Sequence, residues 1–175
     1  MRVASPDADR FKAGEVVQVV TTYFNMSSNN PLVNGTYTSV AATGLTATIT
    51  PTSASNKIFI IFNLNIQSSG SFGGDVVRLV RDSTNICFAD AAGTRIRGCN
   101  AVVRHEVGDN YDYTGESIVN SFLDSPGDTN AHTYKVNLYD DTANNTVWIN
   151  RDRPSSDGSG WRRTVSTITV MEIAG

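Results

Sequence analysis

Charged residues are scarce in this chain, and their balance points to no ionic partner. Asp, Glu, Lys and Arg make up 18% of the 175 residues, and the formal net charge is -3. Binding to nucleic acid needs a cationic surface that displaces counterions from phosphates, and binding to an anionic membrane needs a comparable basic patch. The composition therefore argues against both nucleic acid and membrane as partners.

Cysteines and long apolar runs are also few. Cys87 and Cys99 are the only cysteines, too few for a disulfide scaffold and without the paired spacing of a zinc site. A single bridge is compatible with the sequence, but two free, partly buried thiols are favoured. Met1–Lys12 lacks the apolar core of a secretory signal, and no apolar stretch is long enough to span a bilayer.

Uncharged polar residues and short strand-like stretches dominate what is present. Ser, Thr and Asn number 17, 19 and 16, and they alternate with Val, Ile and aromatic residues in a period of two. No stretch of ten residues has the apolar spacing of an amphipathic helix. Turn sequences such as Ser125–Asp128 separate the strand-like stretches. Strands are predicted at Glu15–Phe24, Thr36–Ala41, Leu45–Thr50, Lys57–Gln67, Asp75–Asp82, Ile86–Ala89, Ile118–Asp124, His132–Tyr139, Thr146–Asn150 and Thr164–Ile173.

This pattern predicts an all-β fold, an antiparallel β-sandwich or jelly roll, formed by one domain over residues 15–175. Residues 1–14 precede it as an N-terminal segment. That segment either forms a short helical turn, with Pro6 at its first position and Gly14 at its end, or is a disordered tail.

Two strands carry apolar residues on both faces, which favours self-association. In Lys57–Gln67, one face is apolar throughout and the other carries Phe59 and Ile61; in Thr164–Ile173, both faces are apolar. A strand of this kind must be covered twice, either by a second subunit or by loops of the same chain. We favour a subunit interface, at Phe59, Ile61, Val165, Ile168, Val170 and Met171.

Residues that could carry out catalysis are sparse and do not form a recognisable motif. His105 and His132 are read as surface residues, His132 at a strand end, and no nucleophile motif accompanies them. The acidic stretches near Asp109–Asp112 and Asp157–Gly160 offer oxygen ligands for calcium but do not match the EF-hand loop. No catalytic residue, cofactor site or metal site is predicted.

The irregular stretch Ala91–Gly115 is the first candidate for a recognition loop, because long excursions between sandwich strands usually lie on the surface. Exposed aromatic residues there or beside a turn could stack on sugars of a host glycan. The candidates are Tyr111, Tyr113 and Trp161.

Four blocks resemble a known group of proteins when they are taken together and in this order. They are Gly14–Val20 (GEVVQVV), Ala42–Ile58 (ATGLTATITPTSASNKI), Ser121–Gly127 (SFLDSPG) and Ser166–Ile173 (STITVMEI). Their combination is similar to virion structural proteins of tailed bacteriophages, which are common in phages of cyanobacteria and other aquatic bacteria. Residues 68–115 match no part of that group and are expected to form the variable surface.

The resemblance implies a jelly roll of the tumour necrosis factor and C1q class, which assembles as trimers. It also implies a non-enzymatic role on the exterior of the virion, either as a head decoration or cement protein or at a tail fibre. The short segment before the first strand slightly favours head decoration, with attachment to capsid or tail proteins through Arg2, Arg10, Phe11 and Lys12. The alternatives are a tail-fibre receptor-binding module for host surface glycans and, third, a polysaccharide depolymerase.

Overall fold

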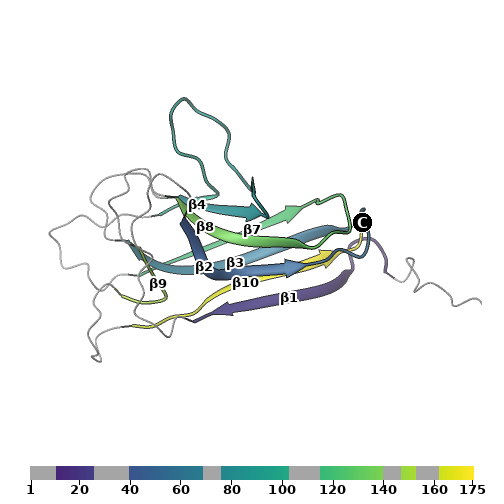
Figure 1. Cartoon of the computed structure of the whole chain (residues 1–175), viewed down its shortest axis with the longest axis horizontal. Helices are drawn as coiled ribbons and strands as arrows, with labels where there is room; N and C mark the ends of the chain where they lie inside the picture. The colour runs from purple at the N-terminus through teal and green to yellow at the C-terminus, as the bar shows by residue number, and fades with distance from the viewer. Residues whose placement is uncertain (1–10, 26–39, 69–75, 103–114, 140–146, 153–161) are drawn as a thin grey trace, which may run out of the picture.

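The structure, a computed structural model, describes residues 11–25, 40–68, 76–102, 115–139, 147–152 and 162–175. All regular secondary structure in these residues is β-strand, arranged as two antiparallel sheets of five strands that lie face to face (Figure 1). Sheet A has the order β1 (Val16–Phe24), β10 (Ser166–Ile173), β3 (Lys57–Ser68), β7 (Glu116–Asp124), with β9 (Val147–Ile149) pairing the end of β3. Sheet B has the order β2 (Val40–Ile49), β8 (His132–Tyr139), β4 (Val76–Arg81), β5 (Thr84–Ile86), with β6 (Asn100–Ala101) also pairing β4.

The strands pair in a nested order. The first strand, β1, pairs with the last, β10; inside that pair, β2 pairs with β8, β3 with β7, and β4 with β5. Strands β1 to β4 therefore alternate between the two sheets, and the hairpin of β4 and β5 is the point at which the chain turns back. The all-β fold and the two antiparallel sheets predicted from the sequence are confirmed.

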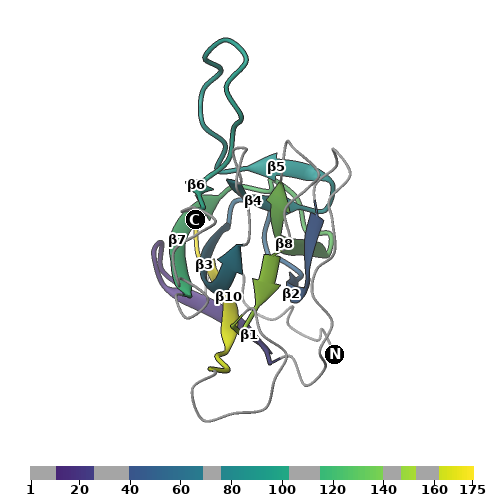
Figure 2. The same ribbon diagram turned by 90° about the vertical axis from the view of Figure 1, so that its left-hand side faces the viewer.

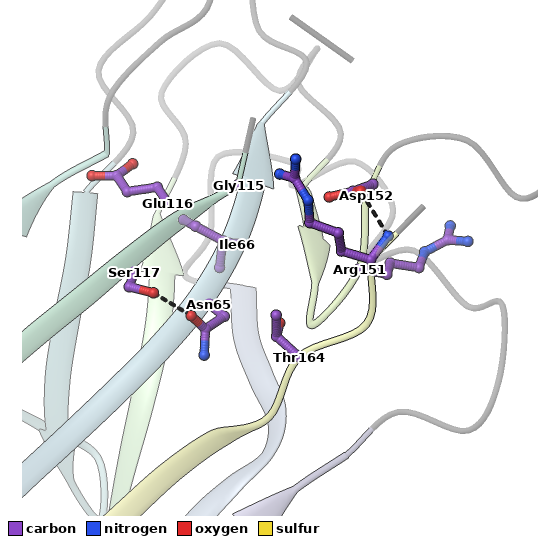
Figure 3. A pocket seen from close by; sticks show the side chains of 9 residues that line it. Asn65, Ile66, Gly115, Glu116, Ser117, Arg151, Asp152 and Thr164 are labelled. Carbon is purple, nitrogen blue, oxygen red and sulfur yellow. Dashed lines mark hydrogen bonds between the residues drawn. The ribbon is translucent and has the colours of Figure 1, made fainter. Parts of the chain in front are cut away.

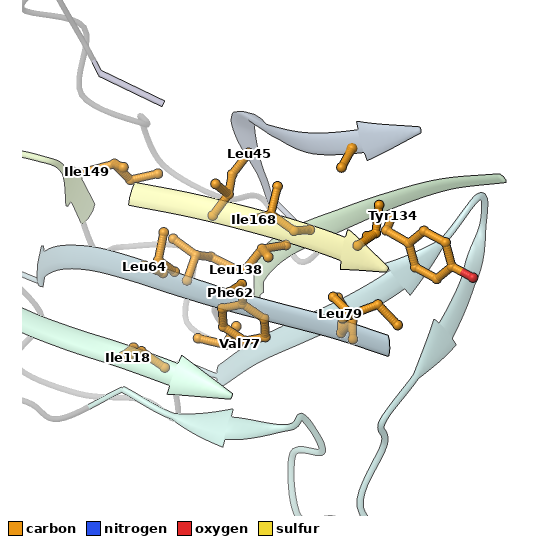
Figure 4. Packing of buried hydrophobic residues seen from close by; sticks show 14 of the residues in the cluster. Leu45, Phe62, Leu64, Val77, Leu79, Ile118, Tyr134, Leu138, Ile149 and Ile168 are labelled. Carbon is orange, nitrogen blue, oxygen red and sulfur yellow. The ribbon is translucent and has the colours of Figure 1, made fainter. Parts of the chain in front are cut away.

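The core lies between the sheets and is filled by the period of two within the strands. On β3, the inward residues alternate from Ile58 to Ile66, and none is more than 2% exposed. Sheet B meets them with its own inward side chains, so that both sheets contribute to one cluster (Figure 4). The labelled members include Phe62, Leu64, Leu79, Tyr134, Leu138 and Ile168.

Most predicted strands are confirmed with ends shifted by a few residues, and β8 has its predicted bounds. Two predictions were wrong. The strand predicted at Ile86–Ala89 is Thr84–Ile86 (β5), because the chain leaves the sheet at Cys87, whose φ is 49°. The separate strands at Thr36–Ala41 and Leu45–Thr50 are, within the described residues, a single strand, β2. Its pairing with β8 is irregular between Ala41 and Thr46. A bulge absorbs extra residues without ending a strand, so the turn-like composition there did not mark a boundary.

A buried carboxylate holds one end of the sandwich together. The Glu172 side chain on β10 is fully covered and accepts hydrogen bonds from Gln18 Nε2 (2.6 Å) and Asn56 Nδ2 (2.6 Å). The backbone amide and the hydroxyl of Thr52 also donate hydrogen bonds to this carboxylate, both to Glu172 Oε1, at 2.6 and 2.8 Å. Burial raises the pKa of this carboxyl, but the hydrogen bonds from Asn56, Gln18 and Thr52 together outweigh it, and the pKa lies below its usual value. The group therefore joins β1, the β2–β3 turn and β10 as an anion.

A second polar cluster links the two sheets directly. Asp124, at the end of β7 in sheet A, accepts hydrogen bonds from Arg81 Nη1 at 2.6 Å and from the Tyr134 hydroxyl at 2.7 Å. Both donors belong to sheet B. Because Asp124 and Tyr134 are buried, this three-residue cluster fixes how the sheets sit on each other.

Candidate assembly face and projecting arm

The outward side of sheet A, called the A face below, is the most distinctive surface of the described residues. The strand register places one apolar residue from each strand in a row across the sheet: Val19, Met171, Phe59 and Leu123. Together with two neighbouring rows, this row makes up the A face as the term is used below; the two rows are Thr21, Thr169, Ile61 and Ser121, then Tyr23, Thr167, Asn63 and Val119. None of the side chains in these three rows carries a charge at neutral pH. The outward row on the other side of the first one holds Val16, Ile173 and the exposed Lys57, which lies at the border of the A face.

Exposed apolar side chains concentrate on this side of the molecule. Of the large apolar residues that are exposed among those described, six belong to strands of sheet A: Val16, Val19, Tyr23, Ile61, Val119 and Leu123. None belongs to sheet B, whose outward positions on β2 and β8 carry Thr46, Thr48, Thr133, Lys135, Asn137 and Tyr139. Val76 and Val80 also face outward on β4, but both are buried. The two outer surfaces thus differ in kind, one apolar and one polar.

The predicted interface residues separate into two groups. Phe59, Ile61 and Met171 lie on the A face, and Val165, 46% exposed, immediately precedes β10. Ile168 and Val170 are 0% exposed and belong to the core cluster, so their assignment to an interface was wrong. The period of two gives which residues share a face of a strand, but not which of two apolar faces is inside.

The predicted attachment and recognition residues are only partly within the described residues. Phe11 and Lys12 are exposed at the start of the described chain, whereas Arg2, Arg10, Tyr111, Tyr113 and Trp161 lie outside it. Lys12 belongs to a turn in which its backbone amide donates to the Glu15 carboxylate at 3.1 Å. Gly14, at a φ of 90°, continues this turn, and its amide donates to Ala174 O at 2.8 Å. The segment is therefore tied to the end of β10.

A projecting arm, residues Cys87–Cys99, leaves the edge of sheet B between β5 and β6 (Figure 2). Stacked side chains hold its base. The Arg78 guanidinium on β4 lies 3.8 Å from the Tyr139 ring centroid and 5.4 Å from that of Phe88, and the Arg97 guanidinium lies 4.3 Å from Phe88. Such cation–π contacts contribute about 0.5–1 kcal/mol each at exposed sites.

Hydrogen bonds reinforce the same base. Arg78 Nε donates to Arg97 O at 3.0 Å, and Arg97 Nε donates to Ala89 O at 2.6 Å. The first half of the predicted loop Ala91–Gly115 is thus an anchored arm. Sequence reasoning missed the anchor, although Arg97 and Phe88 flank the arm at positions that allow them to stack.

A small pocket opens where β3, β7 and the β9–β10 connection meet, and its lining mixes both charges (Figure 3). Glu116, Arg151 and Asp152 line it, and Asp152 Oδ2 accepts a hydrogen bond from the Arg162 amide at 2.8 Å. Its volume of about 130 Å³ is well below the roughly 300 Å³ at which small-molecule sites begin. Burial, followed by the charge of Arg163, lowers the pKa of Arg151. The pocket does not have the size of a substrate site.

His132 is a buried structural residue, and the prediction of a surface position for it was wrong. Its Nδ1 lies 2.9 Å from Asp82 Oδ2, and its Nε2 lies 3.1 Å from Asp128 Oδ1. With a carboxylate on each ring nitrogen, neither nitrogen faces an open site. The ring joins the β4–β5 turn to the start of β8. His105 lies outside the described residues.

Within the described ranges, no three or more His, Cys, Asp or Glu residues cluster in a way that could hold a metal ion. No helix there is long and apolar enough to span a membrane.

Comparison with known proteins assigns this chain to no family. No protein-family model matches the chain, and no curated protein matches it. Among solved structures, it is similar to part of dimeric latent PorU from Porphyromonas gingivalis, with a TM-score of 0.45 and 11% sequence identity. The match covers 97% of this chain but 14% of that one. A likeness this weak carries no inference about this chain.

Proposed function

We propose that this chain is a non-enzymatic structural protein on the exterior of a tailed-bacteriophage virion, where it forms homotrimers through the A face. The observation that carries the proposal is the contrast between an apolar, uncharged A face and the polar outer surface of sheet B. The resemblance of four sequence blocks to virion structural proteins is the reason for proposing a location on a phage particle. The same resemblance is the reason for proposing three copies.

The nested strand order supports a jelly roll. In that fold, eight strands roll up so that the first pairs with the last, the second with the seventh, and so on inward. Setting aside the short strands β6 and β9, the eight remaining strands pair in this way. This pairing supports the jelly roll that the resemblance implies.

The chemistry of the A face favours a second copy of this chain over a charged partner. Its three rows hold Val, Ile, Leu, Met, Phe and Tyr among Thr, Ser and Asn, so burial removes apolar surface without desolvating a charge. The three rows occupy about 20 Å along each of four strands spaced about 4.8 Å apart, which gives a footprint on the order of 400 Å². A standard interface buries about 800 Å² per partner, so the face supplies about half of one and the residues around it must supply the remainder.

The projecting arm is compatible with this arrangement, because it leaves the edge of sheet B. Association through sheet A would leave the arm exposed, as a surface component requires. Attachment to capsid or tail proteins is assigned to the N-terminal segment, of which Phe11 and Lys12 are exposed.

Two measurements test the proposal. Light scattering of the isolated protein over a range of concentrations should give the mass of a trimer, and a monomer at micromolar concentration would refute the assembly. The trimer should then bind assembled phage heads and not host cells. Binding to host cells instead would favour a glycan-recognising tail-fibre module, and release of reducing sugar from host polysaccharide would favour a depolymerase.

A further inference from the structure

The two cysteines meet at the base of the projecting arm. On one edge of β4, Ile86 of β5 pairs with Leu79, and Asn100 of β6 pairs with Val77. Cys87 follows Ile86 and Cys99 precedes Asn100, so both cysteines fall beside the intervening residue, Arg78. Val77 and Leu79 are two residues apart, about 6.6 Å along β4, so the residues that pair with them, Asn100 and Ile86, hold the two cysteines next to each other at the base of the arm.

The side chains converge as well as the backbone. The thiols of Cys87 and Cys99 are in hydrogen-bonding contact, and Cys99 Sγ also lies 3.2 Å from Val77 O. Both are half-buried and pack against the core cluster. The stack of Arg78, Phe88 and Arg97 joins the two limbs of the arm near its base.

We propose that Cys87 and Cys99 form an intramolecular disulfide that closes the base of the arm once the protein meets an oxidising small-molecule disulfide such as oxidised glutathione. The thiols are free in the structure. The proposal concerns the arm alone and holds whether or not the chain belongs to a virion. It chooses the single bridge, which the sequence leaves open, over two free thiols as the state of the oxidised protein.

The chemistry is thiol–disulfide exchange in two steps. The Cys87 thiolate attacks one sulfur of oxidised glutathione, so that a Cys87–glutathione bond forms, the glutathione S–S bond breaks and one glutathione thiolate leaves. The Cys99 thiolate then attacks the Cys87 sulfur, the protein disulfide forms and the second glutathione leaves. Two protein thiols are oxidised, one oxidised glutathione is reduced to two molecules of glutathione, and each departing thiolate takes up one proton.

Cys87 is assigned the first attack because the Cys99 thiol is already engaged by Val77 O at 3.2 Å and burial raises the pKa of Cys99 to about 11. Burial also raises the pKa of Cys87. Since the thiolate is the attacking species, the reaction is expected to be slow at neutral pH and faster in mildly alkaline buffer.

The full-length protein provides the test. It is reduced, freed of reductant, kept folded with oxidised glutathione in mildly alkaline buffer, quenched with acid and digested with trypsin without reduction. The expected product is the peptide Asp82–Arg95 linked to Gly98–Arg104, with both titratable thiols lost. Two surviving thiols, a glutathione adduct that persists on the wild-type protein, or bridges between molecules would each overturn the proposal.

Single-cysteine variants serve as controls for the exchange steps. Cys99→Ser should retain glutathione on Cys87, because the resolving thiol is missing. Cys87→Ser should react more slowly at Cys99. If Cys99→Ser released its glutathione as fast as wild type, Cys99 would not be the resolving thiol. The wild-type peptide map decides the proposal even if a variant folds poorly.

Discussion

Leu123 offers a sharp test of the A face. Its side chain is 48% exposed and lies in register with Phe59, which is followed across the sheet by Met171 and Val19. Full burial of a leucine side chain stabilises by about 1.5–3 kcal/mol, so covering the exposed half is worth about 1 kcal/mol for each copy. Leu123→Glu removes that gain and places a carboxylate where association would strip it of water, at a further cost of several kcal/mol.

The expected result is loss of the trimer with the fold intact. Because every 1.4 kcal/mol changes a dissociation constant about tenfold, Leu123→Glu should shift the concentration of half-assembly at least tenfold upward. Analytical ultracentrifugation measures this, and far-ultraviolet circular dichroism monitors the fold. Thr48→Glu is the matched control, since Thr48 is exposed on the outer surface of sheet B. Equal effects of the two substitutions, or none from Leu123→Glu, would refute the assignment of the A face.

Three further predictions concern the polar clusters and the arm. Because hydrogen bonding lowers the pKa of Glu172 in the folded state below its ordinary 4.5, the carboxylate stabilises the fold above that pH and the contribution disappears as the pH falls. Glu172→Gln should therefore cost about 2–4 kcal/mol at pH 7 in urea unfolding and flatten the loss of stability toward acid; an unchanged acid limb would contradict this. Asp124→Ala should cost about 3 kcal/mol, because Arg81 and the Tyr134 hydroxyl lose their shared acceptor, and a loss below about 1 kcal/mol in the same assay would show that the cluster does not link the sheets. Arg78→Ala should free the base of the arm and speed tryptic cleavage after Arg95 while the trimer persists; unchanged cleavage would mean that the stack does not hold the arm.

The alternation of residues along the chain predicted the fold class and the core because each strand follows the period of two closely. It failed on β10 for a physical reason. The inward residues of this strand are Ser166, Ile168, Val170 and Glu172, and the outward residues include Met171. Both ends of the inward face are polar because Ser166 and Glu172 bond to other segments at the ends of the core. Hydropathy alone cannot recognise such residues as buried.

The arm and the buried histidine escaped prediction for a related reason, since their partners are distant in sequence. Arg78 anchors the arm through Arg97 and also meets Tyr139 on a different strand. His132 is covered because Asp82, 50 residues away, turns toward it at the β4–β5 turn. Each pairing depends on the nested strand order, which the strand pattern does not specify by itself.

The location of the resembling blocks gives a physical reason to connect the A face with assembly. Gly14–Val20 and Ser166–Ile173 fall on β1 and β10, and Ser121–Gly127 includes the end of β7, all in sheet A, whereas Ala42–Ile58 covers most of β2 in sheet B and the start of β3. The stretch 68–115, which resembles nothing in that group, contains β4, β5, the arm and β6, along one edge of sheet B. In a ring of three copies, each copy must fit a different patch on its neighbour, so a residue of the contact is constrained by the residues of that patch. An arm that leaves the far edge of sheet B has no such constraint. The division of the sequence therefore separates the arm and its edge of sheet B, which resemble nothing in that group, from all of sheet A and β2, and it is the division expected if the arm is the displayed, variable part.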